Sequence, residues 1–235
     1  MINYKIKKMK QILGILIACI VLQSCKSQSD FDLAKIILNQ DKISDIIPKD
    51  VKMVTYDIGV AEGNYKYTST GSDKILIYNQ INFSGENPKA NYENKAALYF
   101  NIKDSIISRY QLEISDTEQS KELLKTLKEK LGSANYTGFK SEKDKTKNIP
   151  DGFIWENIKE NTLYHLTYSK QHYGIHATLN VLPILETYPA LPGFSYWEDF
   201  TFQRNKRKDP DYTYQQYLRD KLENNPSNIQ NRLSK

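Results

Sequence analysis

The chain has 235 residues, of which 33 are Lys or Arg and 28 are Asp or Glu, so its formal net charge is +5. Four of the lysines lie within the first ten residues, and without them the charge falls from +5 to +1. A charge this close to balance gives no general argument for binding nucleic acid, and we expect no nucleic-acid partner. The length predicts one or two domains.

The N-terminal segment has the layout of an export signal. A basic stretch over residues 1–10 is followed by an apolar run from Ile12 to Leu22. This run falls well short of the roughly 20 residues that a membrane-spanning helix needs, and it fits the hydrophobic part of a signal peptide. The alternative is an uncleaved core helix.

The motif Leu22-Gln23-Ser24-Cys25 ends the apolar run. It resembles the lipobox of bacterial lipoproteins, in which a Leu stands three positions before an obligatory Cys and a small residue stands directly before it. The resemblance implies that residues 1–24 are removed and that Cys25 carries the lipid, including palmitate-type acyl chains. Several such chains anchor a protein stably. Lys26 follows Cys25, which by the enterobacterial sorting rule implies the outer membrane, facing the periplasm.

The cysteine count also bears on how the mature protein is held together. Cys19 leaves with the signal and Cys25 is lipidated, so we expect no intramolecular disulfide and a domain held by its core alone. Residues 25–30 form a short tether, which at about 3.3 Å per residue reaches less than about 20 Å. The domain is therefore expected to lie close to the membrane.

The N-terminal half of the mature chain predicts a short helix followed by strands. Apolar spacing favours a helix over residues 31–38, and the Val, Ile and Tyr content that follows is typical of strands. The predicted elements are strands over 51–58 and 74–83, a loop over 84–94, and a hairpin of 98–102 with 106–114.

The clearest helix follows this hairpin. Ser115-x-x-Glu118 has the form of a capping box, the leucines from Leu123 to Leu131 share one helix face, and Gly132 is a typical helix end. The later elements are a charged loop over 140–147, strands over 153–157, 162–169 and 173–182, an aromatic segment over 196–202, and a helix begun by the capping box Thr213-x-x-Gln216.

Together these elements predict a single α+β domain over residues 31–223. We expect an antiparallel β-sheet meander with helices packed on one side, and a polar C-terminal tail over residues 224–235.

The three histidines, His165, His172 and His176, are the candidate metal ligands in the sequence. If Tyr168 pairs with Tyr173, His165 lies opposite His176, and two facing imidazoles can share a metal. No Cys or nearby carboxylate completes a ligand set, so we expect no metal, no cofactor and a solvated strand face.

The sequence contains none of the catalytic motifs for which we searched. It has no Gly-x-Ser-x-Gly elbow, no His-Glu-x-x-His motif and no glycine-rich phosphate loop. Glu156 next to Trp155 is a candidate acid, but alternation places Phe153 and Trp155 inward and Glu156 outward, so a solvated Glu156 is expected. A pair of carboxylates of the glycosidase type is a remaining alternative, because the spacing of residues in the sequence does not show which carboxylates lie close together in space.

Two features favour binding over catalysis. The chain has 17 Tyr and two Trp, which can build a contact surface for carbohydrate or protein, although most should be ordinary strand residues. A basic cluster near the C-terminus can meet acidic lipid head groups or an acidic partner, with a solvated loop as the alternative. The candidate binding residues are Trp155, Tyr164, Tyr168, Trp197, Arg204, Lys206, Arg207 and Lys208.

The sequence therefore predicts an envelope-anchored, non-catalytic binding or interaction protein with an envelope protein as its partner, in the role of an accessory, inhibitor or immunity factor. Two alternatives stay open: a carboxylate-dependent hydrolase of cell-wall or glycan material, and a receptor for a small molecule or sugar.

Overall fold

The computed structural model describes residues 31–57, 65–87, 89, 92–139, 142–184, 194, 197–209 and 211–224. Contacts divide the chain into Met1–Asp30 and Phe31–Lys235, and all described residues belong to the second unit. The predicted signal peptide, Cys25, the tether and residues 225–235 of the predicted tail lie outside the described residues. None of the described helices has the length and apolar character needed to cross a bilayer.

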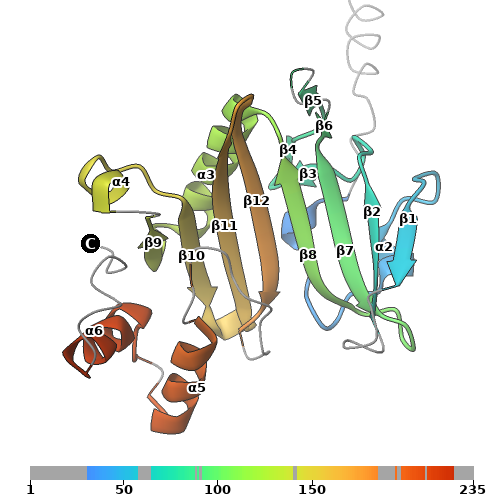
Figure 1. Ribbon diagram of the computed structural model, residues 1–235. Coiled ribbons are helices and arrows are strands. Elements are labelled where there is room, and N and C mark those ends of the chain that lie inside the picture. Colours follow the sequence, from blue (N-terminus) through green and yellow to red (C-terminus); the bar gives the residue numbers. More distant parts are fainter. Residues whose placement is uncertain are drawn as a thin grey trace, which may run out of the picture. The chain divides into compact units, whose positions relative to one another are not determined.

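Eight antiparallel strands form one sheet in the order β1-β2-β7-β8-β12-β11-β10-β9 (Figure 1). The predicted α+β class and antiparallel meander are confirmed, because β10, β11 and β12 follow one another in both sequence and space. The strands of this sheet are β1 Val54–Asp57, β2 Tyr65–Thr70, β7 Lys95–Asn101, β8 Ile107–Ile114, β9 Tyr136–Gly138, β10 Gly152–Asn157, β11 Thr162–Gln171 and β12 Gly174–Pro183.

Helices and two small ladders surround this sheet. The short ladders pair β3 Ile77–Tyr78 with β4 Ile81–Asn82, and β5 Glu86–Asn87 with β6 Tyr92–Glu93. The helices are η1 Leu33–Lys35, α2 Ile43–Ile46, α3 Thr117–Leu131, α4 Glu142–Thr146, η3 Ile158–Glu160, α5 Trp197–Arg207 and α6 Tyr214–Asn224. β9 and α4 lie in stretches where the sequence indicated no regular element.

The long helix α3 begins one residue later than its predicted capping box. The Asp116 carboxylate accepts a hydrogen bond from the Gln119 N–H at 2.9 Å, while the hydroxyl of the predicted cap, Ser115, donates to the Tyr92 carbonyl at 3.0 Å. Asp and Ser are about equally good N-caps. Because the Ser115 hydroxyl is engaged with Tyr92, the neighbouring Asp116 caps the helix. Gly132 ends the helix with a φ of 80°, as its position predicted.

One face of the sheet packs on the larger hydrophobic core. Alternate residues of β8 and β12, such as Leu112 and Leu179, are fully buried, as are Leu123 and Leu127 of α3. The N-terminal segment and the stretch between β2 and β7 extend this core along the same face, through Leu33, Leu38, Ile75, Leu76, Tyr78 and Phe83.

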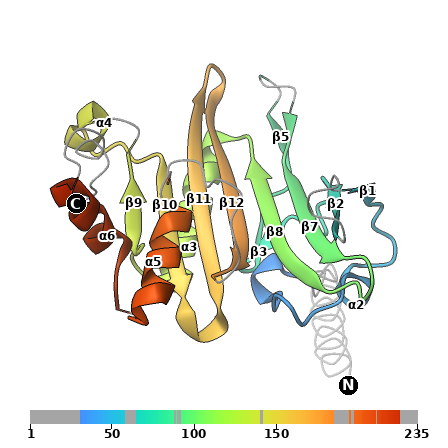
Figure 2. The same ribbon diagram turned by 60° about the horizontal axis from the view of Figure 1, so that its bottom comes forward.

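A second core lies on the opposite face, where α5 and α6 pack. In β10, Phe153 and Trp155 belong to the α3 core, whereas Ile154 between them belongs to the core under α5 and α6. Figures 1 and 2 show α3 and α5 on opposite sides of β10–β12. The helices therefore occupy both faces of the sheet, where the sequence indicated one, because β9–β11 carry apolar side chains on both faces.

The segment predicted as one strand over residues 74–83 is instead the β3–β4 hairpin. Asn79 and Gln80 form its turn with φ values of 51° and 67°. Two consecutive left-handed residues are the geometry of a tight hairpin turn, which reverses the chain after Tyr78.

Candidate functional site

Two of the predicted binding aromatics, Trp155 and Tyr164, are core residues, and a third, Tyr168, is partly buried against the core. Trp155 is 2% exposed and its indole N–H donates to the Gly132 carbonyl at 2.9 Å. Tyr164 is also buried, and burial raises its pKa to about 12. The Tyr168 hydroxyl donates to the Ser120 carbonyl of α3 at 3.0 Å, and burial raises its pKa as well. Trp155 and Tyr168 fasten α3 to the sheet, and none of the three side chains contributes to an exposed aromatic platform.

The fourth aromatic, Trp197, belongs to the second core. It is 2% exposed, and its ring centroid lies 5.0 Å from that of Phe200 and 4.9 Å from that of Tyr214. Phe194 extends the cluster onto the sheet, 5.2 Å from the His165 ring. The aromatic richness of the C-terminal segment thus builds the contact that joins α5 and α6 to β9–β11.

The predicted basic cluster divides between different environments within and just after α5. Arg204 is 7% exposed, lies over the Phe200 ring at 4.7 Å and donates from Nη1 to Glu156 Oε1 at 2.7 Å. Arg207 lies over the Tyr212 ring at 4.1 Å and pairs with Asp220 at 2.9 Å. Lys206 and Lys208 are exposed.

The structure corrects the expectation for Glu156. Its side chain points outward from the α3 core as alternation predicted, but it is only 12% exposed and is paired with Arg204. The prediction of a solvated acid was wrong because the sequence pattern did not show that α5 covers this part of the sheet.

A pocket of about 400 Å³ opens beside this ion pair, a volume within the ordinary range for small-ligand sites. The β10–β11 connection, the end of β12 and the C-terminal part of α5 with the two residues after it supply its walls. The lining residues are Ile158, Asn161, Ile184, Arg204, Asn205, Lys208 and Asp209, and we call this cavity the Arg204 pocket.

Local backbone structure places these side chains. Asn161 adopts a left-handed conformation with φ 50° and closes η3, and its carbonyl accepts from the Ile184 N–H at 3.2 Å. Lys208 has φ 54° and its N–H donates to the Asn205 carbonyl at 3.2 Å, which ends α5 at the pocket rim. These two local backbone conformations place Asn161 and Lys208 in the pocket lining.

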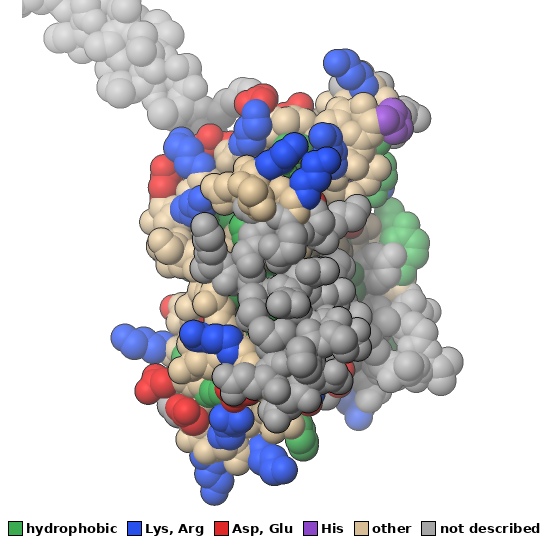
Figure 3. All heavy atoms as spheres, turned by 60° about the vertical axis from the view of Figure 1, so that its left-hand side comes forward, with side chains coloured by type: hydrophobic (Ala, Val, Ile, Leu, Met, Phe, Trp, Pro, Cys, Tyr) green, Lys and Arg blue, Asp and Glu red, His purple; other side chains and the backbone are tan. Residues whose placement is uncertain are grey.

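The pocket has a mixed chemical character. Ile184 is 6% exposed and Ile158 is 60% exposed, so the aliphatic part of the lining has one buried and one exposed side chain. Figure 3 shows Lys and Arg side chains interleaved with Asp and Glu side chains at the lower end of the molecule. Of the predicted binding residues, Arg204 and Lys208 line the pocket. The lining residues Ile158, Asn161, Asn205 and Asp209 were not predicted from the sequence, because no local pattern indicates that the β10–β11 connection meets the end of α5.

The described lining of the pocket holds one carboxylate, that of Asp209. The Glu156 carboxylate next to it is held by Arg204. The pair of converging acids that glycoside hydrolysis uses is not found among these lining residues.

The histidines do not face each other. Tyr168 pairs with Ala177 and not with Tyr173, so His165 lies opposite Asn180 and His176 lies opposite Ser169. His165 is fully buried, which corrects the expected solvated face. Within the described ranges, no cluster of three or more His, Cys, Asp or Glu residues can hold a metal.

Comparison with protein-family models finds no match to this chain, and comparisons with curated proteins and with solved structures find none either.

Proposed function

We propose that this chain is a lipid-anchored, non-catalytic binding protein of the bacterial cell envelope. The lipid is attached at Cys25 and inserts into the outer membrane. The folded domain lies on the periplasmic side of that membrane. The lipobox-like Leu22-Gln23-Ser24-Cys25 and the basic and apolar stretches before it support the anchor. Its partner is an envelope protein that contacts the surface around the Arg204 pocket.

One observation carries the binding part of this proposal, namely the chemical make-up of the Arg204 pocket. The guanidinium of Arg204 and the side chains of Asn161 and Asn205 offer hydrogen-bond donors, and Ile158 offers exposed aliphatic surface. Such a lining orients and retains a partner's side chain, and Arg is a residue type enriched at the centres of protein interfaces.

The anchor is tested by mass spectrometry and cell fractionation in a lipoprotein-processing bacterium. We expect the purified protein to begin at Cys25 and to carry acyl chains, and Cys25→Ser to move the protein from the membrane to the soluble fraction. Finding Met1 intact, or an unmodified Cys25 thiol, contradicts the anchor.

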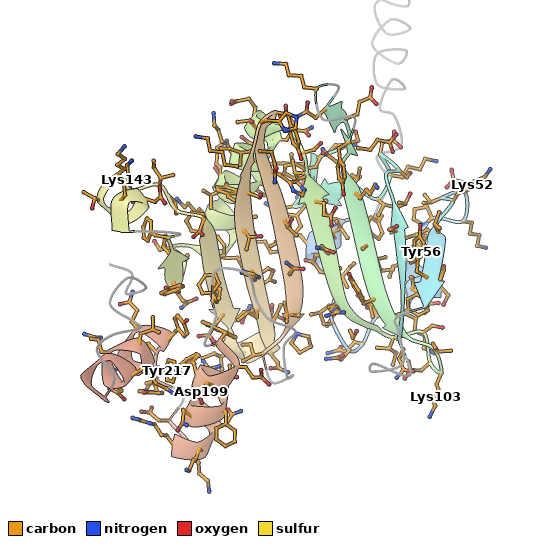
Figure 4. All side chains as sticks on the ribbon, in the orientation of Figure 1. Lys52, Tyr56, Lys103, Lys143, Asp199 and Tyr217 are labelled. Atoms are coloured by element: carbon orange, nitrogen blue, oxygen red, sulfur yellow. The ribbon has the colours of Figure 1, made fainter. Side chains whose placement is uncertain are left out.

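The partner is tested with a photo-reactive amino acid placed at Lys208, at the pocket rim. The matched control carries it at Lys103, an exposed residue of the β7–β8 turn far from Asp199 of α5 (Figure 4). We expect one reproducible protein adduct from position 208 that is absent from position 103 and is abolished by Ile158→Asp. Equal adducts from both positions, or no adduct, reject a protein partner at this surface.

A further inference from the structure

The Arg204 guanidinium retains donor capacity that its ion pair does not use. It has five N–H groups in a fixed planar fork, and one hydrogen bond runs from Nη1 to Glu156 Oε1. The Phe200 ring lies 4.7 Å from the guanidinium carbon and packs against it. Arg204 lines the pocket, so its guanidinium borders that space.

This donor array selects an acceptor. A guanidinium donates only, and the planar fork matches the two oxygens of a carboxylate. The ammonium of Lys208 adds a second cation to the lining, beside the single carboxylate of Asp209. Glu156 holds Arg204 in place through one nitrogen, which fixes the orientation of the fork before a ligand arrives.

The aliphatic part of the pocket selects what the carboxylate is attached to. Ile184 is 6% exposed and is part of the pocket wall, whereas Ile158, also in the lining, is 60% exposed. Covering Ile158 removes apolar surface from water, which favours a branched aliphatic group over a polar one. A volume of about 400 Å³ accommodates a group of this size together with its carboxylate.

We propose that the Arg204 pocket binds a carboxylate carried by a branched aliphatic group, with the carboxylate on Arg204 and the aliphatic group on Ile158 and Ile184. This inference rests on the proposed binding function and names the chemistry that the pocket recognises. Two sources supply that chemistry, a free small acid and the C-terminal residue of a polypeptide.

The test is a ligand-observed NMR titration of the purified full chain in detergent micelles. The probes are isovalerate, N-acetyl-leucine, N-acetyl-leucinamide and a tetrapeptide ending in leucine. We expect isovalerate and N-acetyl-leucine to bind, and the amide, which lacks the carboxylate, to bind at least about tenfold more weakly. Equal binding of N-acetyl-leucine and its amide overturns the proposal.

Variants then locate the site. Ile158→Ala and Lys208→Glu change exposed residues, and each should weaken the binding of isovalerate several-fold. Arg204→Lys keeps the positive charge but loses the planar array of guanidinium donors, and it should weaken the binding of isovalerate about tenfold. Lys206→Glu is the matched control, since Lys206 carries the same charge on α5 but does not line the pocket. If Lys206→Glu weakens binding as much as Lys208→Glu does, the pocket is not the site.

The outcomes separate this inference from the proposed function. Binding of the tetrapeptide as well as isovalerate identifies a polypeptide C-terminus as a source, and binding of isovalerate without the tetrapeptide identifies a free acid; both support the carboxylate chemistry. A protein adduct at position 208 without any carboxylate binding overturns the inference and leaves the binding function standing. Carboxylate binding without an adduct leaves the inference standing and rejects the protein partner.

Discussion

Glu156 accepts a hydrogen bond from Arg204 at 2.7 Å across 48 positions of sequence, and the two side chains are 12% and 9% exposed. The pair joins β10 to α5 at the edge of the Arg204 pocket. Because both groups are largely removed from water, each depends on the other for its charge to be satisfied.

We therefore expect Arg204→Ala to lower the free energy of unfolding by roughly 2–4 kcal/mol, since it leaves the largely buried Glu156 carboxylate unpaired. Urea denaturation measures this. Arg207→Ala is the matched control, because Arg207 pairs with Asp220 at side-chain exposures of 49% and 43% and should cost less than about 1 kcal/mol. Equal losses in the two variants contradict the structural role given to the Glu156–Arg204 pair.

Gly174, which begins β12, is a second sensitive position. Its φ is +133°, and a Cβ at this residue would lie 2.3 Å from the Thr117 hydroxyl oxygen, which accepts the Ile175 N–H at 2.9 Å. We expect Gly174→Ala to cost roughly 2–3 kcal/mol, because strain and overlap add together.

Gly132→Ala separates these two causes for Gly174. Gly132 also has a positive φ, 80°, but no atom lies within 4 Å of the added Cβ, so backbone strain alone, about 1–2 kcal/mol, should oppose the change. Thermal unfolding of both variants gives the comparison. A loss at Gly132 as large as that at Gly174 shows that the contact with Thr117 contributes nothing.

Asp32 holds the β3–β4 turn in place. Its carboxylate accepts from the N–H groups of Asn79 at 2.8 Å and Gln80 at 2.9 Å, and from that of Ala34 at 2.9 Å. Asp32→Asn turns one acceptor oxygen into a donor, so we expect a loss of roughly 1–3 kcal/mol.

Hydrogen exchange locates the effect of Asp32→Asn. The Gln80 amide should exchange faster, while the Asn39 amide, which donates to the Ile107 carbonyl at 2.8 Å, should keep its protection relative to global unfolding. Unchanged exchange at Gln80 argues against the proposed role of the carboxylate.

Asp199 should make the stability of the fold depend on pH in the acidic range. The ammonium of Lys221 and the hydroxyl of Tyr217, both from α6, lower the pKa of Asp199 on α5, and Figure 4 shows Asp199 and Tyr217 close together between the two helices. A carboxyl group whose pKa is lowered by folding stabilises the fold at any pH above its pKa in the unfolded chain, which is near 4. This contribution is lost as the pH falls through the pKa of the folded chain.

Asp199→Asn should therefore be less stable than the unaltered chain at pH 7, by about 1 kcal/mol or less because the carboxylate is partly solvated. The difference should shrink as pH falls below 4. Urea denaturation between pH 7 and pH 2.5 measures it. A difference that stays constant over this range rules out the lowered pKa as its cause.

The sequence by itself determined the elements whose signals are local. Alternation predicted the hairpin β7–β8 and the meander β10–β12, and leucine spacing with Gly132 predicted α3. The capping box Thr213-x-x-Gln216 is confirmed, with the Gln216 N–H donating to Thr213 Oγ1 at 3.2 Å and the Thr213 N–H donating to Gln216 Oε1 at 2.7 Å. These features depend on residues within a few positions of one another, so a linear pattern contains them.

Tertiary structure decided which surfaces meet. Nothing in the sequence near Glu156 indicates Arg204, and nothing near Ile158 indicates Lys208, because each pair is brought together by the return of α5 onto β9–β11. The histidine pairing failed for a related reason. The observed register of β11 and β12 differs from the predicted one by four residues, and such an even shift keeps every side chain on its face but changes each partner. Alternation records the face that a residue occupies, and only packing between distant segments fixes its neighbour.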